Sequence, residues 1–263
     1  MWTILILVIV FALLLFHRRI PQFFGQFGRS VGTVGRVGKE LATDEEPTSS
    51  VLVRYEVQAG EMLAQKYLKE HPPSSAFPLQ SRVQTIGERL AALARRSEIP
   101  YRFVVVESEE PNAFALPGGL ILITLPLVEL CNDDSQIAGL LAHEIVHVDR
   151  KHAVRNVAAE AAVKAGVRFL TGRAAILSRV SNSMENLVSK GYRQDQEFEA
   201  DLLGTRLARQ AGFAETGLRT LLETTQQLTG GKTPVVAEAF AFFKSHPPLA
   251  MRIERLRQDN AGR

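Results

Sequence analysis

Two histidines four residues apart impose the strongest constraint on how this chain can fold. Residues 143–147 read HEIVH. On an α-helix, positions i and i+4 lie one turn apart on the same face, so His143 and His147 can direct two imidazoles at one metal ion. Glu144 lies beside them, where it could accept a proton from a water molecule at the metal. The spacing matches the HExxH pattern of zinc metalloproteases.

The sequence before the motif indicates that the pattern is not accidental. HExxH also arises by chance in helices whose histidines are merely partly exposed side chains. Here, two acidic residues and Ser135 provide a helix start, and apolar residues recur at helical spacing in Ile137, Leu140 and Leu141. We therefore expect a helix over residues 134–151 with one buried face, as the metal chemistry requires.

A catalytic zinc ion usually has three protein ligands and one open position for water, so a third ligand is needed. His152 follows His147 by five residues, which does not match the metzincin spacing. Glu197 and Asp201 in the segment QEFEAD stand at i and i+4 and share a helix face. We predict that Glu197 completes a His₂Glu site and that Asp201 orients a ligand imidazole. Glu199 points elsewhere on that helix and is expected to lie in solvent.

Composition excludes several classes of protein. A chain of 263 residues can hold one sizeable core, so we expect one catalytic domain. The formal charge of +3 is too small to indicate nucleic-acid binding, and no basic and aromatic residues alternate as on a base-stacking surface. Cys131 is the only cysteine, which rules out an intrachain disulfide. The oligomeric state stays open.

The amino terminus has the properties of a membrane segment. Residues 1–16 carry no charged side chain and would span about 24 Å as a helix. Basic residues follow this run instead of preceding it, which favours a retained transmembrane anchor over a cleaved signal segment. Residues 17–50, basic and rich in Gly before they turn acidic, are expected to form a juxtamembrane linker. The positive-inside rule favours a cytoplasmic domain, but the same residues suit a solvated linker, so the membrane side stays open.

Residues 51–263 are expected to form the catalytic domain. The β-branched stretch 101–108 indicates a strand, and residues 113–124 indicate two strands turned at Pro117, Gly118 and Gly119. Besides the HEIVH helix, apolar spacing predicts helices over 56–70, 79–97, 153–170, 183–211 and 214–228, with an amphipathic pair near 157–180 covering the site. Helices around a small sheet define an α+β fold that is mostly helical.

Four blocks of sequence make the pattern more specific than HEIVH alone. They are NAFALPGG at 112–119, LLAHEIVHVDRKH at 140–152, EFEAD at 197–201 and SHPPLAMRIERL at 245–256. In this order they resemble the family of zinc metallopeptidases that includes HtpX and the CAAX prenyl endopeptidases. The chain lacks the transmembrane helices that surround the site of membrane-embedded members, so it is closer to the single-anchor or soluble bacterial type. That departure argues against the processing of prenylated proteins.

The resemblance assigns roles to individual residues. It implies a zincin-like domain with one Zn²⁺ held by His143, His147 and Glu197, and Glu144 as general base. It also implies an edge strand that pairs with an extended polypeptide substrate and consists of Asn112, Ala113, Phe114 and Ala115.

Two residues near the carboxyl terminus are less specific. His246, which precedes two prolines, is a candidate catalytic donor to the oxyanion, or else a turn residue with a structural role. Arg252 either lines the same cleft or supports the fold.

The expected function is peptide-bond hydrolysis by a zinc-dependent endopeptidase acting on extended or misfolded polypeptides. By resemblance, it would serve protein quality control from an anchor in the bacterial inner membrane. One alternative is a non-proteolytic binding or chaperone-like module that keeps zinc for structure, and another is a metal-dependent hydrolase of non-peptide substrates. The open fourth position and Glu144 argue against a structural zinc ion.

Overall fold

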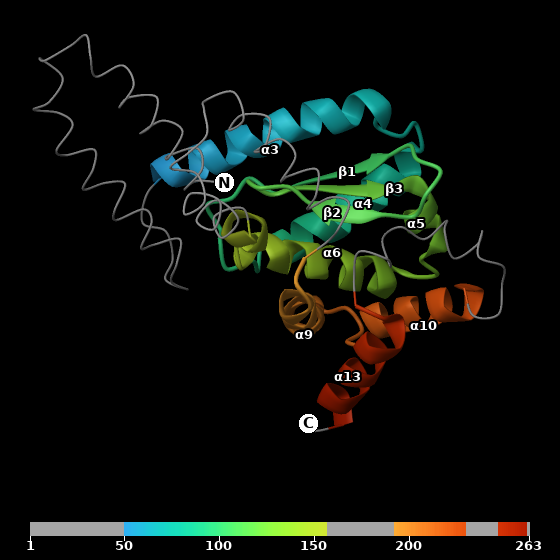
Figure 1. Ribbon diagram of the computed structural model, residues 1–263. Coiled ribbons are helices and arrows are strands. Elements are labelled where there is room, and N and C mark those ends of the chain that lie inside the picture. The colour runs from blue at the N-terminus through green and yellow to red at the C-terminus, as the bar shows by residue number, and fades with distance from the viewer. Residues whose placement is uncertain (1–49, 157–191, 230–246, 262–263) are drawn as a thin grey trace, which may run out of the picture.

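The computed structural model describes residues 50–156, 192–229 and 247–261, which form a mostly helical α+β unit with a small sheet (Figure 1). The predicted fold class is therefore confirmed for this part of the chain. The elements in chain order are α3 (Ser50–Glu70), α4 (Phe77–Ala91), β1 (Arg102–Val106), β2 (Ala113–Ala115), β3 (Leu120–Thr124), α5 (Leu125–Leu130), α6 (Asp134–Asp149), α9 (Gln194–Gln210), α10 (Gly217–Thr229) and α13 (Leu249–Ala261).

The three strands form one sheet in the order β1–β3–β2, so β2 lies at an edge. β1 runs parallel to β3 and β2 runs antiparallel to it, and Leu122 of β3 pairs with Val104 on one side and Phe114 on the other. The predicted reversal between β2 and β3 is confirmed. Gly118 and Gly119 have φ angles of 79° and 88°, a left-handed conformation that glycine adopts without steric cost.

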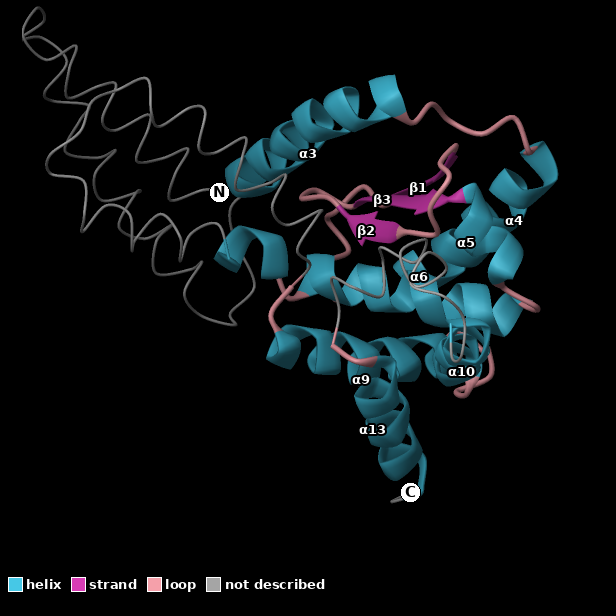
Figure 2. Ribbon diagram, turned by 45° about the vertical axis from the view of Figure 1, so that its right-hand side comes forward, coloured by secondary structure: helices cyan, strands magenta, loops and turns pink. Residues whose placement is uncertain are grey.

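Helices cover both faces of the sheet. Successive side chains of a strand point to opposite sides, so the apolar residues of β3 are buried on both faces. Leu120 and Leu122 of β3 pack in a cluster with Ala64 of α3. Ile121 and Ile123 belong to the larger core that β3 shares with α4 and α6. Figure 2 shows the sheet between α3 on one side and α6 on the other.

The HEIVH helix, α6, is buried on every side. All residues from Gln136 to Val148 are buried, whereas we expected a single buried face. The segments GLLA and IV place small or apolar side chains around the helix, which is the pattern of a central core helix. Asp133 caps its start, because the Asp133 side chain accepts a hydrogen bond from the Gln136 backbone N–H at 2.9 Å.

Helices α9 and α10 pack on α6 on the side away from the sheet, and α13 packs against both (Figure 1). α9 lies tightly against α6 at Gly204, where a Cβ atom would lie 2.8 Å from the His143 backbone nitrogen. A side chain does not fit into that gap. Gly204 therefore sets the short distance between the helix that carries the histidines and the helix that carries Glu197.

Some boundaries differ from the prediction. α3 begins at Ser50 instead of residue 56, and α4 ends at Ala91 instead of residue 97. The end of α4 has a tertiary cause, since the backbone N–H groups of Arg95 and Arg96 donate to the Asp149 carboxylate at 2.9 and 3.1 Å. That contact takes the chain out of the helical path.

The apolar segment 1–16, most of the linker, the expected helices over 157–180 and His246 lie outside the described residues. The boundaries of the anchor, linker and catalytic domain stay predictions. Within the ranges that the structure describes, no helix combines the length and the apolar character needed to cross a membrane.

Candidate metal centre

Three buried side chains from two helices converge between α6 and α9. The two Nε2 atoms of His143 and His147 are 3.1 Å apart. Carboxylate oxygens of Glu197 lie 3.5 Å from Nε2 of His143 and 3.7 Å from Nε2 of His147. The structure thus brings together the three residues that the sequence singled out as ligands.

The donor set fits a tetrahedral metal ion. Zinc binds His nitrogen and carboxylate oxygen at about 2.0–2.2 Å, which places ligand atoms of a tetrahedron roughly 3.3–3.6 Å apart. The three separations of 3.1, 3.5 and 3.7 Å scatter around that range. Two imidazoles and one carboxylate also leave a fourth position for water, as catalytic zinc sites do.

His143 is supported by a buried ion pair. Its Nδ1 lies 2.9 Å from Oδ1 of Asp201, as predicted for a carboxylate that orients a ligand imidazole. Arg252 of α13 is fully buried and donates to both Asp201 oxygens at 2.8 and 2.6 Å, so it contacts the site through Asp201.

The same groups set the charge of this half of the site. Burial raises the pKa of Asp201, but the Arg252 guanidinium outweighs burial and holds it well below its ordinary value. Burial lowers the pKa of His143, but hydrogen bonds with Asp201 and Glu197 outweigh it and raise that pKa to about 9. Carboxylates that favour a proton on His143 also favour a metal cation beside it.

His147 is supported by a different set of groups. Its Nδ1 faces Nδ1 of His152 at 3.0 Å, and Nε2 of His152 lies 3.1 Å from Oε2 of Glu199. Arg150 donates to the other Glu199 oxygen. The expectation that Glu199 lies in solvent is therefore wrong: it is about one-third exposed and bonded to two neighbours. His152, excluded as a ligand by its spacing, lies behind His147.

Glu144 lies buried next to the three converging side chains. Burial is the main cause that raises its pKa to about 7, and the nearby Glu197 carboxylate acts in the same direction. The backbone N–H of Ala115 in β2 donates to the Glu144 carboxylate. Its Oε2 atom has no hydrogen-bond partner among the described residues. A carboxylate with a pKa near neutrality and an available acceptor atom suits general-base chemistry.

The edge strand β2 passes directly over the site. Thr124 N–H donates to the carbonyl of Asn112, and Leu116 N–H donates to that of Leu120. Because antiparallel pairing alternates, the backbone groups of Ala113 and Ala115 point away from β3. β2 itself is buried, so this outer edge is covered in the structure.

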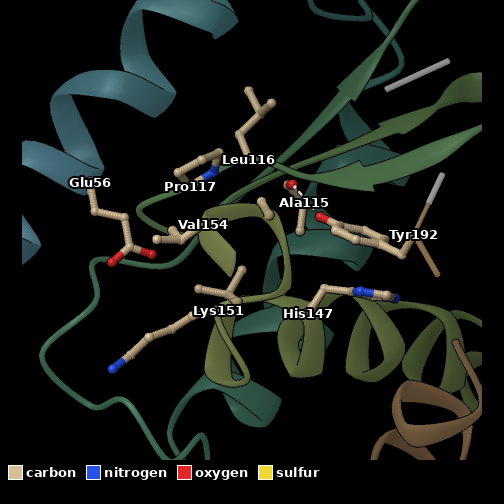
Figure 3. A pocket seen from close by; sticks show the side chains of 10 residues that line it. Glu56, Ala115, Leu116, Pro117, His147, Lys151, Val154 and Tyr192 are labelled. Carbon is tan, nitrogen blue, oxygen red and sulfur yellow. Dashed lines mark hydrogen bonds between the residues drawn. The ribbon is translucent and has the colours of Figure 1, made fainter. Parts of the chain in front are cut away.

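Tyr192 takes part in that cover. Its ring stacks on His147 with centroids 3.8 Å apart, and its hydroxyl donates to the Ala115 carbonyl at 3.3 Å. Figure 3 shows both contacts beside a pocket of about 10 Å³, which is roughly the space of one water molecule. This role was not predictable from the sequence, because Tyr192 belongs to none of the motifs.

Comparison with known proteins places the chain in a family. The pattern of peptidase family M48 matches residues 78–260, which include the HEIVH helix and the EFEAD segment. The chain belongs to peptidase family M48. It is therefore a metallopeptidase, and the predicted membership in a metallopeptidase family is confirmed. The roles of the individual residues stay predictions.

Several known metallopeptidases are similar to this chain over most of its length. Metalloprotease YcaL of Escherichia coli is 28% identical over 70% of this chain and 73% of its own length. Mitochondrial metalloendopeptidase OMA1 of Schizosaccharomyces pombe is 26% identical over 70% of this chain and 54% of its own length. The beta-barrel assembly-enhancing protease of Escherichia coli is 25% identical over 78% of this chain but only 43% of its own length. The chain thus spans about half the length of the latter two proteins.

Proposed function

We propose that this M48 metallopeptidase is a zinc-dependent endopeptidase that cleaves extended or misfolded polypeptides near a membrane. The observation that carries the proposal is the position of Glu144. It lies between the converging atoms of His143, His147 and Glu197 and the backbone of edge strand β2. A proton acceptor, a metal-binding donor set and a strand that can position a peptide thus lie at one place.

The chemistry follows from these positions. His143, His147 and Glu197 would hold Zn²⁺, and when bound the ion supplies a Lewis acid that acidifies water and polarises the scissile carbonyl. Glu144 would accept the water proton on Oε2 and then deliver it to the leaving amine. Burial raises the pKa of Glu144, which would help the carboxylate hold the proton between the two transfers.

The substrate class is proposed from β2. An extended peptide adds to a sheet edge through backbone hydrogen bonds, which requires a segment that is not already folded. The outward backbone groups of Ala113 and the carbonyl of Ala115 would provide such pairing, because the Ala115 N–H already donates to Glu144. Because the Tyr192 hydroxyl holds the Ala115 carbonyl, an incoming strand would replace that contact.

The location is proposed from the amino terminus. Residues 1–16 would anchor the enzyme in a membrane, which we propose to be the bacterial inner membrane. A role in protein quality control is supported by the similarity to a relative named beta-barrel assembly-enhancing protease.

The test compares the full-length wild type with Glu144→Gln, using metal analysis and cleavage of casein with and without a chelator. The variant should keep one zinc ion per chain and lose about 10²- to 10⁴-fold in activity, because it can no longer accept the proton. Glu223→Gln, at a surface ion pair of α10, is the matched control and should keep full activity.

Two outcomes would contradict the proposal. Full cleavage by Glu144→Gln would exclude Glu144 as the base. Zinc bound by a wild type that cleaves neither casein nor a peptide library would favour the non-proteolytic binding module instead.

A further inference from the structure

Behind His147 lies a hydrogen-bonded chain of side chains that no step of the proposed mechanism uses. It runs from Nδ1 of His147 to Nδ1 of His152 at 3.0 Å, and from Nε2 of His152 to Oε2 of Glu199 at 3.1 Å. Arg150 binds the far oxygen of Glu199. His152 is almost completely buried, so water does not compete for its hydrogen bonds.

The positions of the atoms fix where the hydrogens must be. His147 directs Nε2 toward His143 and Glu197, so binding a metal there requires its hydrogen to be on Nδ1. Two ring nitrogens 3.0 Å apart share one hydrogen, so Nδ1 of His152 must be the acceptor. The hydrogen of His152 is then on Nε2, where it donates to Glu199. Each link of the chain selects the tautomer of the next.

The backbone conformation before His152 is unusual. Lys151 has a φ angle of 55°, a left-handed conformation that is uncommon for residues other than glycine and costs free energy. Lys151 lies two positions after Asp149, the last residue of α6, and changes the direction of the chain. The His152 ring therefore lies next to His147. On a continuing helix, a residue five positions later would point roughly 140° away from His147.

A second contact holds this returning segment on α9. Asn156 and Gln196 exchange two amide hydrogen bonds, both of 2.9 Å. This pair anchors residues 152–156 to the first turn of α9 independently of His152. Replacement of His152 can therefore test its hydrogen bonds without releasing the segment.

We propose that His152 and Glu199 are positioning residues that fix the tautomer and ring orientation of His147 for metal binding. The inference rests on the proposed metal site and deepens it. Ligand histidines usually donate their second N–H to a carboxylate, a backbone carbonyl or water. Here a histidine takes that place and passes the hydrogen bond on to a carboxylate.

The test measures Zn²⁺ affinity of the full-length protein by competition with a chelator, and the visible spectrum of the Co²⁺-loaded protein. His152→Ala should lower the affinity about 10- to 100-fold and change the Co²⁺ spectrum, because His147 loses its acceptor. His152→Asn should recover most of the affinity, since the Asn oxygen can take the position of Nδ1. His71→Ala, a histidine bonded to the Glu107 carbonyl away from the site, is the control and should change neither readout.

The results distinguish a role of His152 in positioning His147 from a role that is limited to packing in the core. Unchanged affinity in His152→Ala, or equal losses in the Ala and Asn variants with the fold intact, would overturn the inference. If His152→Ala does not fold, Glu199→Ala decides instead, because Glu199 is partly exposed: weaker binding supports the chain and unchanged binding refutes it. A wild type that binds no Zn²⁺ would refute the proposed metal site itself, which is a distinguishable failure.

Discussion

The two motif histidines have the same chemistry and lie one turn apart, yet the groups behind them differ. His143 rests on the buried pair of Asp201 and Arg252, in which both partners are almost inaccessible to solvent. His147 rests on His152, which leads to the partly exposed pair of Glu199 and Arg150. His143 contacts a carboxylate directly. His147 contacts a neutral imidazole, which in turn bonds to a carboxylate.

Two ligands of the same chemistry therefore need not be equally important for the fold. A buried ion pair contributes little net stability when intact, but the loss of one partner leaves a charge in the core. A partly exposed pair is hydrated when it is broken, so its loss costs much less. We therefore expect damage behind His143 to act on folding, and damage behind His147 to act chiefly on metal affinity.

The largest effect is expected for Arg252→Met, which breaks the support of His143. The free energy of unfolding should fall by about 3–5 kcal/mol, because Asp201 loses its cation in a buried position. Arg257→Met is the matched control on the same helix, since Arg257 pairs with Glu223 at the surface, and it should cost no more than about 1 kcal/mol. Denaturant unfolding of the metal-free proteins measures both values, and similar losses would contradict the distinction.

A smaller effect is expected for Gly204→Ala, which disturbs both supports together. The added Cβ would lie 2.8 Å from a backbone atom of His143, so α9 must move away from α6. We expect a loss of about 1–3 kcal/mol in unfolding free energy and weaker Zn²⁺ binding. Gln210→Ala, exposed on the same helix, should change neither quantity. A Gly204→Ala protein with wild-type affinity would show that the helix separation does not govern the site.

The smallest effect is expected from acid, and it separates the two supports by their charge. Burial raises the pKa of Asp201, but Arg252 dominates and holds it well below its ordinary value of 3.8. Such a carboxylate contributes stability above pH 3.8 and loses it as the pH falls toward the folded pKa. Protonation of Asp201 should therefore lower the free energy of unfolding by up to about 1.4 kcal/mol for each pH unit in that range.

The measurement is the pH dependence of unfolding for the metal-free wild type and for Asp201→Asn, on both sides of pH 3.8. The variant should show a shallower decline, because its amide does not titrate. Identical slopes would mean that the Asp201–Arg252 pair is not the acid-sensitive element.

The grouping of the ligand residues was predictable because it depends on local periodicity. The i,i+4 spacing places His143 with His147, and Glu197 with Asp201, on single helix faces. The strand pair around Gly118 and Gly119 was predictable for the same reason, since a short turn determines it.

Apart from Asp201, the supports behind the histidines were not predictable, because they depend on tertiary contacts. Nothing in the sequence indicates that Lys151 adopts a left-handed conformation, which places His152 between His147 and Glu199. Arg252 lies 51 positions beyond Asp201, and although the sequence singled it out, no pattern indicated that it pairs with Asp201. The apolar composition of α6 is consistent with its burial on all sides, whereas the spacing of Ile137, Leu140 and Leu141 alone predicts one buried face.

The separation of the ligands along the chain has a consequence for folding. His147 precedes Glu197 by 50 positions. An ion held by both would act as a removable cross-link, closing a loop much as a disulfide does. In the chain-entropy model, closing a loop of roughly 50 residues lowers the entropy of the unfolded chain, which stabilises the folded state by about 4 kcal/mol. The metal ion would then cross-link α6 and α9. The availability of zinc would determine the stability of the folded enzyme as well as its activity.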